Sequence, residues 1–448
     1  MSKNLYLGVD IGGTKIAVGV VDSSGDVLYS LKCPTPQNAS SRTVYNHLLA
    51  LIKSILKENK IGPIDLKGIG VGVPGIVKPN HRDILVTPNI KLAGFPLASE
   101  LENNFKIPIV IANDVNLGLL GEKWMGAAQN AKNAVGIFLG TGVGGAILIN
   151  GHLLEGSDGA AAEIGHMYLD LHSTKTSAGL KGTLEALAGR RSLEREIKEL
   201  IRSGKKSLVS EMLGKNFTVI KSSVLSKALR KKDPVVTSAV NHLCFVLGHA
   251  CISLRHVLNP DMFVFGGGVI EACGWYIIPR VQKISDANPF FKKVDHCKII
   301  RSWLGDDAVI LGAVALLKQS LGDKIAPQRD FYPPMKMTKN KRVNVDGKIL
   351  KPSFYIRADG RLKEIEPVQA IHNNSLKKTH QLGIDVLRKA CKKSPHALIV
   401  GHVLKNSTIN AQARQFLMEK SIHKHVLPLS KAVQLYNNMQ DRKAFIAF

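Results

Sequence analysis

Residues 5–15, LYLGVDIGGTK, decide the fold that we expect for this chain. Alternate apolar residues up to Val9 form the pattern of a half-buried strand, and two adjacent glycines after Asp10 allow the chain to turn back. Further strands are expected over residues 16–21 and 26–31, so the chain begins with a meander of strands. The common nucleotide motifs GxxxxGKS/T and GxGxxG both require a helix after their glycines, and neither spacing occurs here.

The glycine-rich tip of this meander has the chemistry of a polyphosphate site. Gly12 and Gly13 let backbone N–H groups approach an anion, Thr14 adds a hydroxyl donor, and Lys15 adds positive charge. Asp10 is a candidate ligand of a hydrated Mg²⁺ ion. An Asp-Gly-Gly tip is also a common hairpin turn without a ligand, so the tip taken alone leaves both interpretations open.

A second glycine-rich tip repeats the first. Residues 135–145, VGIFLGTGVGG, again predict a strand and a glycine-rich tip with a threonine, and a strand follows. This internal duplication favours two facing domains that each contribute backbone donors to one nucleotide. The candidate donor-binding residues of this tip are Gly140, Thr141, Gly142, Gly144 and Gly145. A third cluster, Gly266, Gly267 and Gly268, follows an expected strand and is the candidate place for a flat adenine ring.

Composition limits the class of protein. The 448 residues suffice for two to four domains, and the short, interrupted apolar runs predict no membrane-spanning helix. The N-terminus lacks the regions of a signal peptide, so a cytoplasmic location is expected. The six cysteines form no CxxC pair, which argues against a zinc ribbon, a redox motif or a disulfide framework.

Positive charge is concentrated toward the C-terminus. Residues 331–448 hold 22 lysines and arginines against 7 aspartates and glutamates, which is +15 of the net +26 of the chain. Such an excess occurs in proteins that bind nucleic acid, anionic surfaces or polymers such as polyphosphate, and also on solvated lysine-rich faces. No basic motif interleaved with aromatic residues is present, which favours the solvated face.

Hydrophobic periodicity outlines the rest of the chain. Helices are expected at 43–57, 97–105, 184–201, 235–257 and 308–318, and strands at 67–73, 107–112 and 261–265. Residues 321–350 are rich in Lys, Pro and Asp and are expected to form a linker. From residue 351 the pattern restarts as a separate small α/β domain.

Several short motifs occur in the order found in the ROK family of sugar kinases, which residues 1 to about 320 resemble. The motifs are DIGGTK at 10–15, PG at 74–75, TPN at 87–89, ND at 113–114, LGTGVGG at 139–145, AAEIGH at 161–166, LEALAG at 184–189 and GGGV at 266–269. The resemblance implies an actin-like, two-domain α/β kinase, a duplicated ribonuclease H-like fold that holds ATP and Mg²⁺ between its domains. The implied domains are residues 1–117, completed by a helix at 306–320, and residues 118–305, followed by the linker at 321–350 and a basic domain at 351–448.

The resemblance also assigns roles to polar residues. Asp114 resembles the family's general base, which accepts the proton of a sugar hydroxyl as that oxygen attacks the γ-phosphorus. An Asn-Asp pair also commonly caps a helix, which is the structural alternative for this residue. The residues that resemble ligands of the sugar hydroxyls are Asn113, Glu163, His166 and Glu185, with Gly75 and Thr87 nearby.

Two features depart from the family pattern. Many ROK proteins follow EIGH with CxCGxxGCxE, and the His and three cysteines hold a structural zinc. Here Thr176, Ala178 and Thr183 stand at the cysteine positions, so we expect no zinc site. ROK repressors carry a winged helix-turn-helix before the first glycine tip. Because Asp10 comes too early for one, we expect no DNA-binding domain.

The C-terminal residues show a less specific resemblance. SFYIRADGRLKE at 353–364, ALIVGHVLK at 397–405 and KAVQLYNNM at 431–439 resemble a small α/β domain of archaeal proteins of unknown function and of a mitochondrial complex I assembly factor. We assign this domain no catalysis. His402 is expected to be a solvent-facing loop histidine.

Together these features predict an ATP-dependent hexokinase of the glucokinase type, acting in glycolysis and assembled as a homodimer or homotetramer, as the resemblance implies. N-acetylmannosamine, N-acetylglucosamine and fructose are alternative sugars, and inorganic polyphosphate is an alternative phosphoryl donor. A non-catalytic sugar-binding regulator or scaffold is the alternative of another class. Retention of Asp10, Lys15 and Asp114 argues against it, because a sensor does not need the base.

Overall fold

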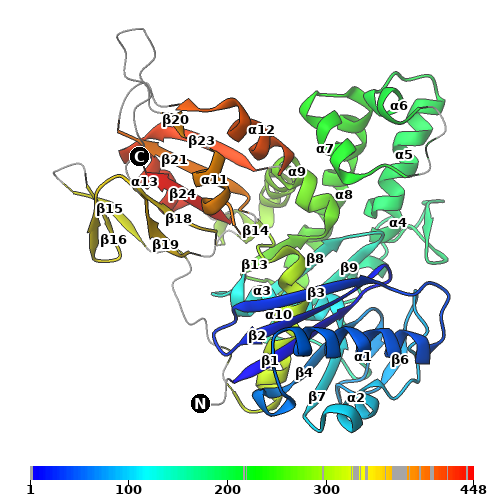
Figure 1. Cartoon of the computed structure of the whole chain (residues 1–448). Helices are drawn as coiled ribbons and strands as arrows, with labels where there is room; N and C mark the ends of the chain where they lie inside the picture. Colours follow the sequence, from blue (N-terminus) through cyan, green and yellow to red (C-terminus); the bar gives the residue numbers. More distant parts are fainter. Residues whose placement is uncertain are drawn as a thin grey trace. The chain divides into compact units, whose positions relative to one another are not determined.

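The structure is a computed structural model, and its chain forms two compact units, Met1–Pro327 and Gln328–Phe448, which are described separately (Figure 1). The described residues are 4–214, 217, 219–294, 297–323, 325, 332, 334–338, 342–358, 360–365, 381–382, 384–392, 395–403, 408–420, 422–439 and 442–447. Asp359 and residues 404–405, which belong to two of the C-terminal motifs, lie outside the described residues.

The first unit contains two five-stranded sheets with the same core topology. In the first, β1 (Leu5–Ile11) is antiparallel to β2 (Lys15–Asp22) and parallel to β4 (Leu66–Val73), and the order is β3-β2-β1-β4-β7. In the second, β8 (Ala134–Leu139) is antiparallel to β9 (Val143–Ile149) and parallel to β13 (Met262–Gly266), and the order is β10-β9-β8-β13-β14. The outer strands are β3 (Val27–Pro34), β7 (Ile109–Asn113), β10 (His152–Leu153) and β14 (Lys298–Arg301). The repetition that the two glycine-rich tips predict is therefore present in the strand order.

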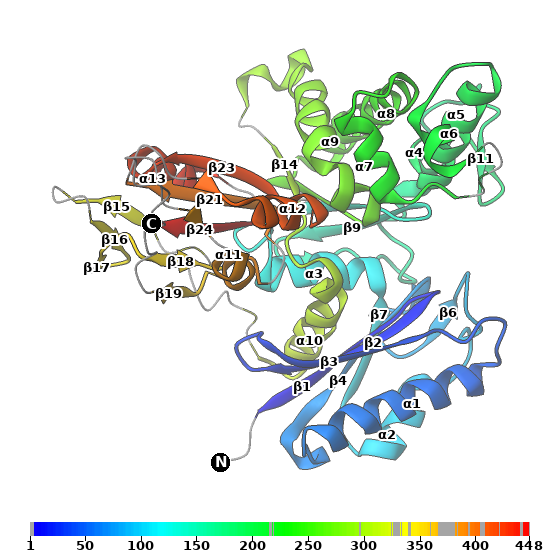
Figure 2. The ribbon, with the colours of Figure 1, turned by 45° about the horizontal axis from the view of Figure 1, so that its top comes forward.

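Helices cover both faces of each sheet. They are α1 (Ser41–Glu58), α2 (Leu97–Phe105), α3 (Asp114–Met125), α4 (Leu184–Ala188), α5 (Arg190–Arg202), α6 (Leu208–Leu213), α7 (Ser222–Arg230), α8 (Pro234–Leu258), α9 (Gly268–Asp286) and α10 (Ala308–Ser320). Leu5, Leu7 and Val9 face α1 and α2, while Tyr6 belongs to the core formed with α3 and α10. The same core includes Ala134 of the second sheet, so α3 and α10 lie between the two sheets (Figure 2).

The close packing of α3 against α10 depends on glycine. A Cβ atom on Gly312 would lie 1.8 Å from the carbonyl oxygen of Leu117, and one on Gly121 would lie 2.2 Å from that of Ala308. In the sheet below, a Cβ atom on Gly8 would lie 2.3 Å from the carbonyl oxygen of Ile310. Backbone therefore meets backbone at these points, and no larger residue fits without displacing a helix.

One described helix, α8, is long and apolar enough to cross a membrane, although no such helix was expected. Of its most apolar stretch, 61% is buried inside the protein. This burial is the arrangement of a core helix, and the buried face packs in the core of the second sheet.

The helix expected at 184–201 is instead two helices, α4 and α5. They are separated by Gly189, which has an extended conformation with φ −64° and ψ 158°. Helix α9 was not expected, and it begins at Gly268. The third glycine cluster is therefore a strand-to-helix turn rather than an open strand end.

The second unit is a mixed sheet with helices on both faces. The strand order is β19-β18-β24-β21-β23, in which β21 is parallel to both β23 and β24 and β18 is antiparallel to β24. The elements are β18 (Phe354–Ile356), β19 (Leu362–Glu364), β20 (Gln381–Leu382), α11 (Ile384–Ala390), β21 (Ala397–His402), β22 (Thr408–Ile409), α12 (Ala411–Glu419), β23 (His423–Pro428), α13 (Leu429–Asn438) and β24 (Lys443–Ala447). Phe445 packs toward α13 and Ile446 toward α11 and α12, as alternation along a strand requires.

The linker expected at 321–350 is in part wrong. Within this range, β15 (Met335–Met337), β16 (Val343–Val345) and β17 (Lys348–Leu350) form a three-stranded antiparallel sheet. Met335 and Val343 are buried in the core that contains Tyr436 of α13. Tertiary burial thus outweighs a composition typical of linkers.

We expect Gly312→Ala to lower the free energy of unfolding of the first unit by about 2 to 4 kcal/mol, because the new methyl group would overlap the backbone of α3. Urea unfolding followed by circular dichroism measures this change. The matched control is Gly62→Ala, where the new Cβ atom would meet no atom closer than 3.6 Å. Equal stability of the two variants would contradict this account of the helix crossing.

Candidate active site

Asp10 lies at the end of β1, where the first sheet meets the glycine-rich tip. It pairs in register with Ala17 of β2 and with Gly72 of β4. Burial raises the pKa of Asp10 to about 7, and the negative charge of Asp114 adds to this effect. Positive charge on Lys15 and Lys32 opposes the shift. The carboxyl group is therefore in a place that favours added positive charge.

The first tip is braced from the side of β3. The N–H of Gly12 donates to the carbonyl oxygen of Lys15 at 2.9 Å, which closes the turn. The hydroxyl of Thr35 donates to the carbonyl oxygen of Gly12 at 2.6 Å, and the side-chain amide of Gln37 donates to that of Gly13 at 2.8 Å. Thr14 lies between these points, and its carbonyl oxygen accepts from the N–H of Thr35. The hydrogen bonds that its carbonyl oxygens accept thus hold the tip in one conformation.

Lys15 is paired with a carboxylate that the sequence reasoning missed. Its Nζ donates to Asp306 Oδ1 at 2.8 Å, and Lys32 Nζ donates to Asp306 Oδ2 at 2.7 Å. Burial opposes ionisation of Asp306, but the two lysines hold its pKa below the usual value. Asp306 lies two residues before α10, so this pair of contacts joins the first tip to the segment that leads into that helix. The 291 residues between Lys15 and Asp306 left no local signal of the contact.

The sequence left open whether the Asn113-Asp114 pair caps a helix or supplies a general base. Asn113 is the N-cap of α3, because its Oδ1 accepts from the N–H of Asn116 at 2.9 Å. Asp114 is the first residue of the helix, and its Oδ1 accepts from the N–H of Val115 at 2.9 Å. Burial raises the pKa of Asp114 to about 6, against these backbone hydrogen bonds, and the charge of Glu163 adds to the rise. Asn113 is therefore the N-cap of α3, while Asp114 contacts the backbone of the first turn and its role as a base stays a prediction.

Gly75 and Thr87 have structural contacts that account for their residue types. Gly75 has φ 107°, and its carbonyl oxygen accepts from the side-chain amide of Asn113 at 2.8 Å. The hydroxyl of Thr87 donates to the carbonyl oxygen of Ile90 and accepts from the N–H of Leu92. These contacts fix the segment that runs beside the end of β7.

Glu163 and His166 face each other on one turn. His166 Nε2 lies 3.9 Å from Glu163 Oε2, and both side chains are exposed. Desolvation raises the pKa of Glu163, and His166 opposes the shift while Glu185 adds to it. Through Glu163, these residues are electrostatic neighbours of Asp114. Asp10, Asp114, Glu163 and Glu185 thus form one connected series of carboxylates.

Glu185 contacts the second glycine-rich tip. Its Oε2 accepts from the N–H of Val143 at 3.0 Å, and a Cβ atom on Gly142 would lie 1.9 Å from this oxygen. A Cβ atom on Gly144 would lie 2.8 Å from the side chain of Val115, which follows Asp114. Gly145 packs equally closely on Ile164, which follows Glu163. The second tip therefore lies between the expected base and the expected sugar ligands, whereas Gly140 has open space where a side chain would stand.

The segment with the substituted cysteine positions is held by backbone pairing. β11 (Thr176–Ser177) pairs with β12 (Leu180–Lys181), and Ala178 lies in the intervening turn with φ 46°. Thr183 is the N-cap of α4 and accepts from the N–H of Ala186. In the part of the chain that the structure describes, no group of three or more His, Cys, Asp or Glu side chains is arranged to hold a metal ion. The expected lack of zinc stays a prediction.

The third glycine cluster packs against the end of β8. A Cβ atom on Gly266 would lie 2.5 Å from Phe138, and one on Gly267, which has φ 85°, would lie 2.5 Å from the carbonyl oxygen of Leu139. Close packing thus explains these two glycines. Gly268 begins α9, and its nearest neighbour at a Cβ position would be the hydroxyl of Ser222 at 3.7 Å. Only this glycine of the three has room beside it.

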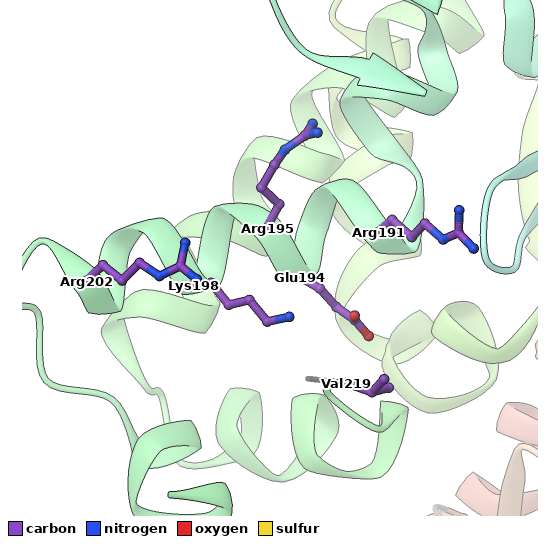
Figure 3. A pocket seen from close by; sticks show the side chains of 6 residues that line it. All are labelled: Arg191, Glu194, Arg195, Lys198, Arg202 and Val219. Atoms are coloured by element: carbon purple, nitrogen blue, oxygen red, sulfur yellow. The ribbon is translucent and has the colours of Figure 1, made fainter. Parts of the chain in front are cut away.

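A cationic pocket of about 420 Å³ lies along α5 and was not expected (Figure 3). It is lined by Arg191, Glu194, Arg195, Lys198, Arg202 and Val219. The four cations recur at spacings that place them on neighbouring turns of one helix. The single carboxylate, Glu194, already accepts from Arg190 Nε at 3.1 Å and from the N–H of Ile220. The N–H of Arg191 donates to the carbonyl oxygen of Thr141 at 3.4 Å, so the pocket begins beside the second tip.

Residues 6–320 match the ROK family. The chain belongs to the ROK family. The two repeated sheets are the actin-like sugar kinase fold of this family, with mixed α and β content. The family match ends at residue 320, so the resemblance proposed for residues 351–448 stays a prediction.

Relatives of this ROK protein include kinases and repressors. It is 32% identical to a glucokinase of Halalkalibacterium halodurans over 320 residues, which is 71% of this chain and 96% of the relative. It is 28% identical to a putative xylose repressor of Caldicellulosiruptor sp. over 70% of this chain and 78% of that relative. A solved ROK glucokinase from Streptomyces griseus, in complex with glucose and AMPPNP, matches with a TM-score of 0.61 and 29% identity, over 70% of this chain and all of that one. The kinase relatives support a hexose kinase, and the repressors leave its specificity open.

We expect Asp114→Asn to raise the free energy of unfolding by about 1 to 3 kcal/mol near pH 7.5, because the folded protein holds the pKa of Asp114 at about 6 rather than near 4. Between these values the folded state binds more protons than the unfolded state, so charged Asp114 lowers stability as pH rises. The gain of the variant should therefore vanish below about pH 4. Urea unfolding at several pH values measures it, with the exposed Asp170→Asn as control. A gain that did not depend on pH would contradict the shift.

Proposed function

We propose that this ROK protein phosphorylates a hexose with ATP, with glucose as the first candidate and glucose 6-phosphate as the product. The proposal is carried by one observation. Asp114, a carboxylate with a raised pKa, lies at the end of β7, and the second glycine-rich tip packs on the residue that follows it. Asp10, where β1 meets the first tip, is close enough to Asp114 for the charge of Asp114 to raise its pKa. Phosphoryl transfer requires a proton acceptor close to backbone groups that can bind the phosphates, and the glycine-rich tips offer such groups.

Asp114 has the properties of a general base for this reaction. With a pKa of about 6 it is ionised at neutral pH, yet it accepts a proton more readily than an ordinary carboxylate. The backbone N–H of Val115 fixes its orientation. In the proposed step the sugar hydroxyl oxygen bonds to the γ-phosphorus, its proton passes to Asp114, and the bond from that phosphorus to ADP breaks.

The residues around Asp10 fit Mg²⁺ and the phosphates of ATP. The pKa of Asp10 is raised to about 7, and both Asp114 and Asp306 add to the rise, so a divalent cation there relieves repulsion among carboxylates. Mg²⁺ supplies charge neutralisation on the phosphates and is commonly held by one or two carboxylates and water. Lys15 and Lys32 lie on the same side, paired with Asp306. Backbone groups of the two tips and of Gly268 are the proposed contacts of the nucleotide.

Three polar residues form the proposed sugar site. Glu163, His166 and Glu185 offer carboxylates and an imidazole that suit a ring of paired hydroxyl groups. N-acetylmannosamine, N-acetylglucosamine and fructose remain alternatives to glucose. A homodimeric or homotetrameric assembly, a cytoplasmic location and a place in glycolysis also remain proposals.

A sugar-binding regulator without catalysis is the alternative of another class, and repressors among the relatives favour it. A sugar kinase needs a general base, and a non-catalytic regulator does not. A regulator needs the sugar ligands but has no use for an acid of raised pKa beside two phosphate-sized tips. Asp114 therefore distinguishes them.

We expect the purified full chain to form ADP and sugar phosphate from ATP, Mg²⁺ and at least one hexose of a panel that includes the four named sugars. Asp114→Asn should lower kcat by about a thousandfold or more, because it removes the proton acceptor while keeping the hydrogen bond to Val115. Coupled ADP release measures turnover, with Asp170→Asn as control. Sugar binding by calorimetry without turnover in either protein would favour the regulator.

Polyphosphate is the second candidate donor, and the cationic pocket along α5 favours it. The pocket begins beside Thr141 of the second tip and continues past Lys198 to Arg202, a path suited to an elongated anion. Helical rise places Arg202 about 16 Å from Arg191 along the axis. Val219 is the single apolar lining residue, so the pocket has no ring on which a nucleic acid base would stack.

We expect the double variant Lys198→Ala and Arg202→Ala to raise KM for a medium-chain polyphosphate about tenfold, with a smaller change in KM for ATP. The reason is loss of two cations from the far end of the pocket, where ATP has no further phosphates. Initial rates with each donor measure this. Arg280→Ala, on α9, is the control, because this cation lies over the ring of Tyr276 instead. Equal loss with both donors would contradict the pocket's proposed role.

A further inference from the structure

Glu185 connects two segments that are far apart in the chain. Its Oε2 accepts from the backbone N–H of Val143 in the second glycine-rich tip at 3.0 Å. Its Oε1 accepts from the hydroxyl of Ser177 in β11 at 2.5 Å. Both oxygens of a residue that resembles a sugar ligand are thus held by the protein itself.

The two sides of the carboxylate are held in different ways. On the side of the tip, the donor is backbone, and a Cβ atom on Gly142 would lie 1.9 Å from Oε2, so the carboxylate occupies space that only a glycine leaves free. On the other side, the donor is the side chain of Ser177. Of these two donors, only the hydroxyl of Ser177 can be removed by substituting a side chain.

The strand that carries Ser177 is anchored to the segment after His166. The N–H groups of Leu169 and Asp170 donate to the carbonyl oxygen of Gly182 at 2.9 and 3.1 Å. The N–H of Leu184 donates to the carbonyl oxygen of Met167 at 2.8 Å. Ser177, Glu185 and the turn of Glu163 and His166 therefore belong to one hydrogen-bonded assembly.

We propose that Ser177 is a positioning residue of the sugar site, which fixes Glu185 between the sugar and the second glycine-rich tip. The proposal rests on the proposed hexose kinase function. A serine hydroxyl donates one hydrogen bond and keeps two lone pairs, so Ser177 can hold Glu185 and still accept from a sugar hydroxyl. None of the three substituted cysteine positions supplies this contact, because Thr176, Ala178 and Thr183 serve the strand, the turn and the helix cap.

The first measurement needs no substrate. Hydrogen–deuterium exchange of the full chain, without ligand, should be several-fold faster in Ser177→Ala over peptides that cover residues 139–147 and 176–185, because Glu185 is released from one of its two donors. Ser177→Thr keeps the hydroxyl and should exchange as the wild type does. Ser173→Ala is the matched control, because Ser173 lies in the same segment but accepts from the N–H of Lys175. Unchanged exchange in Ser177→Ala would overturn the proposal.

The second measurement separates positioning from a general loss of structure. With ATP and glucose, Ser177→Ala should raise KM for glucose about fivefold to twentyfold and change kcat and KM for ATP less than threefold, because Asp114 and the donor contacts are intact. Ser177→Thr should restore KM to within threefold of wild type. A fall in kcat alone, or no rescue by threonine, would overturn the role in sugar binding. If the wild type turned over no hexose, the kinase proposal would fail, whereas the exchange data would still decide whether Ser177 holds Glu185.

Discussion

The close crossing of α3 and α10 is the constraint on which the site depends. Each helix brings a glycine against the other's backbone, and both belong to the core shared by the two sheets. Because backbone contacts leave no slack, the ends of the helices are fixed relative to the strands beside them. Asp114 begins α3, Asp306 lies two residues before α10, and Asp10 is near the end of β1, on which α10 packs. Three carboxylates from distant parts of the chain are placed by one packing contact.

Two of those carboxylates, Asp10 and Asp114, oppose the stability of the fold when they are ionised. Burial raises the pKa of Asp10 and Asp114 well above that of a free aspartate, and each charge raises the pKa of a neighbour. Lys15 and Lys32 form ion pairs with Asp306 and only partly offset the pKa rise of Asp10, so the positive charge does not neutralise all the acids. A site that repels its own charges in this way is organised for a cationic partner. This is the physical reason to prefer a catalytic over a purely structural reading.

Sequence patterns predicted the parts of the fold that are determined by residues close together in the chain. Alternation in residues 5–9 predicted β1, the apolar periodicity of residues 97–105 matched α2, and two similar glycine tips predicted the repeated topology. Contacts between residues far apart in the sequence, such as Lys15 and Asp306, could not be predicted. The strands at residues 335–350 were missed because their composition is that of a linker, and burial of Met335 and Val343 is a property of the folded unit.

Sequence reasoning also did not predict the hydrogen bonds that polar side chains near the site make. Thr87, Asn113 and Glu185 have residue types that suit a hexose, yet Thr87 closes a turn, Asn113 caps a helix and Glu185 binds the second tip. These contacts do not exclude sugar binding, since a carboxylate oxygen accepts more than one hydrogen bond. They do mean that sugar contacts by Glu185 are made by a group that also orders the donor loop. One carboxylate thus contacts both the sugar side and the second tip through separate oxygens, Oε1 accepting from Ser177 and Oε2 from Val143, so loss of the Ser177 contact alters the acceptor side more than the donor side.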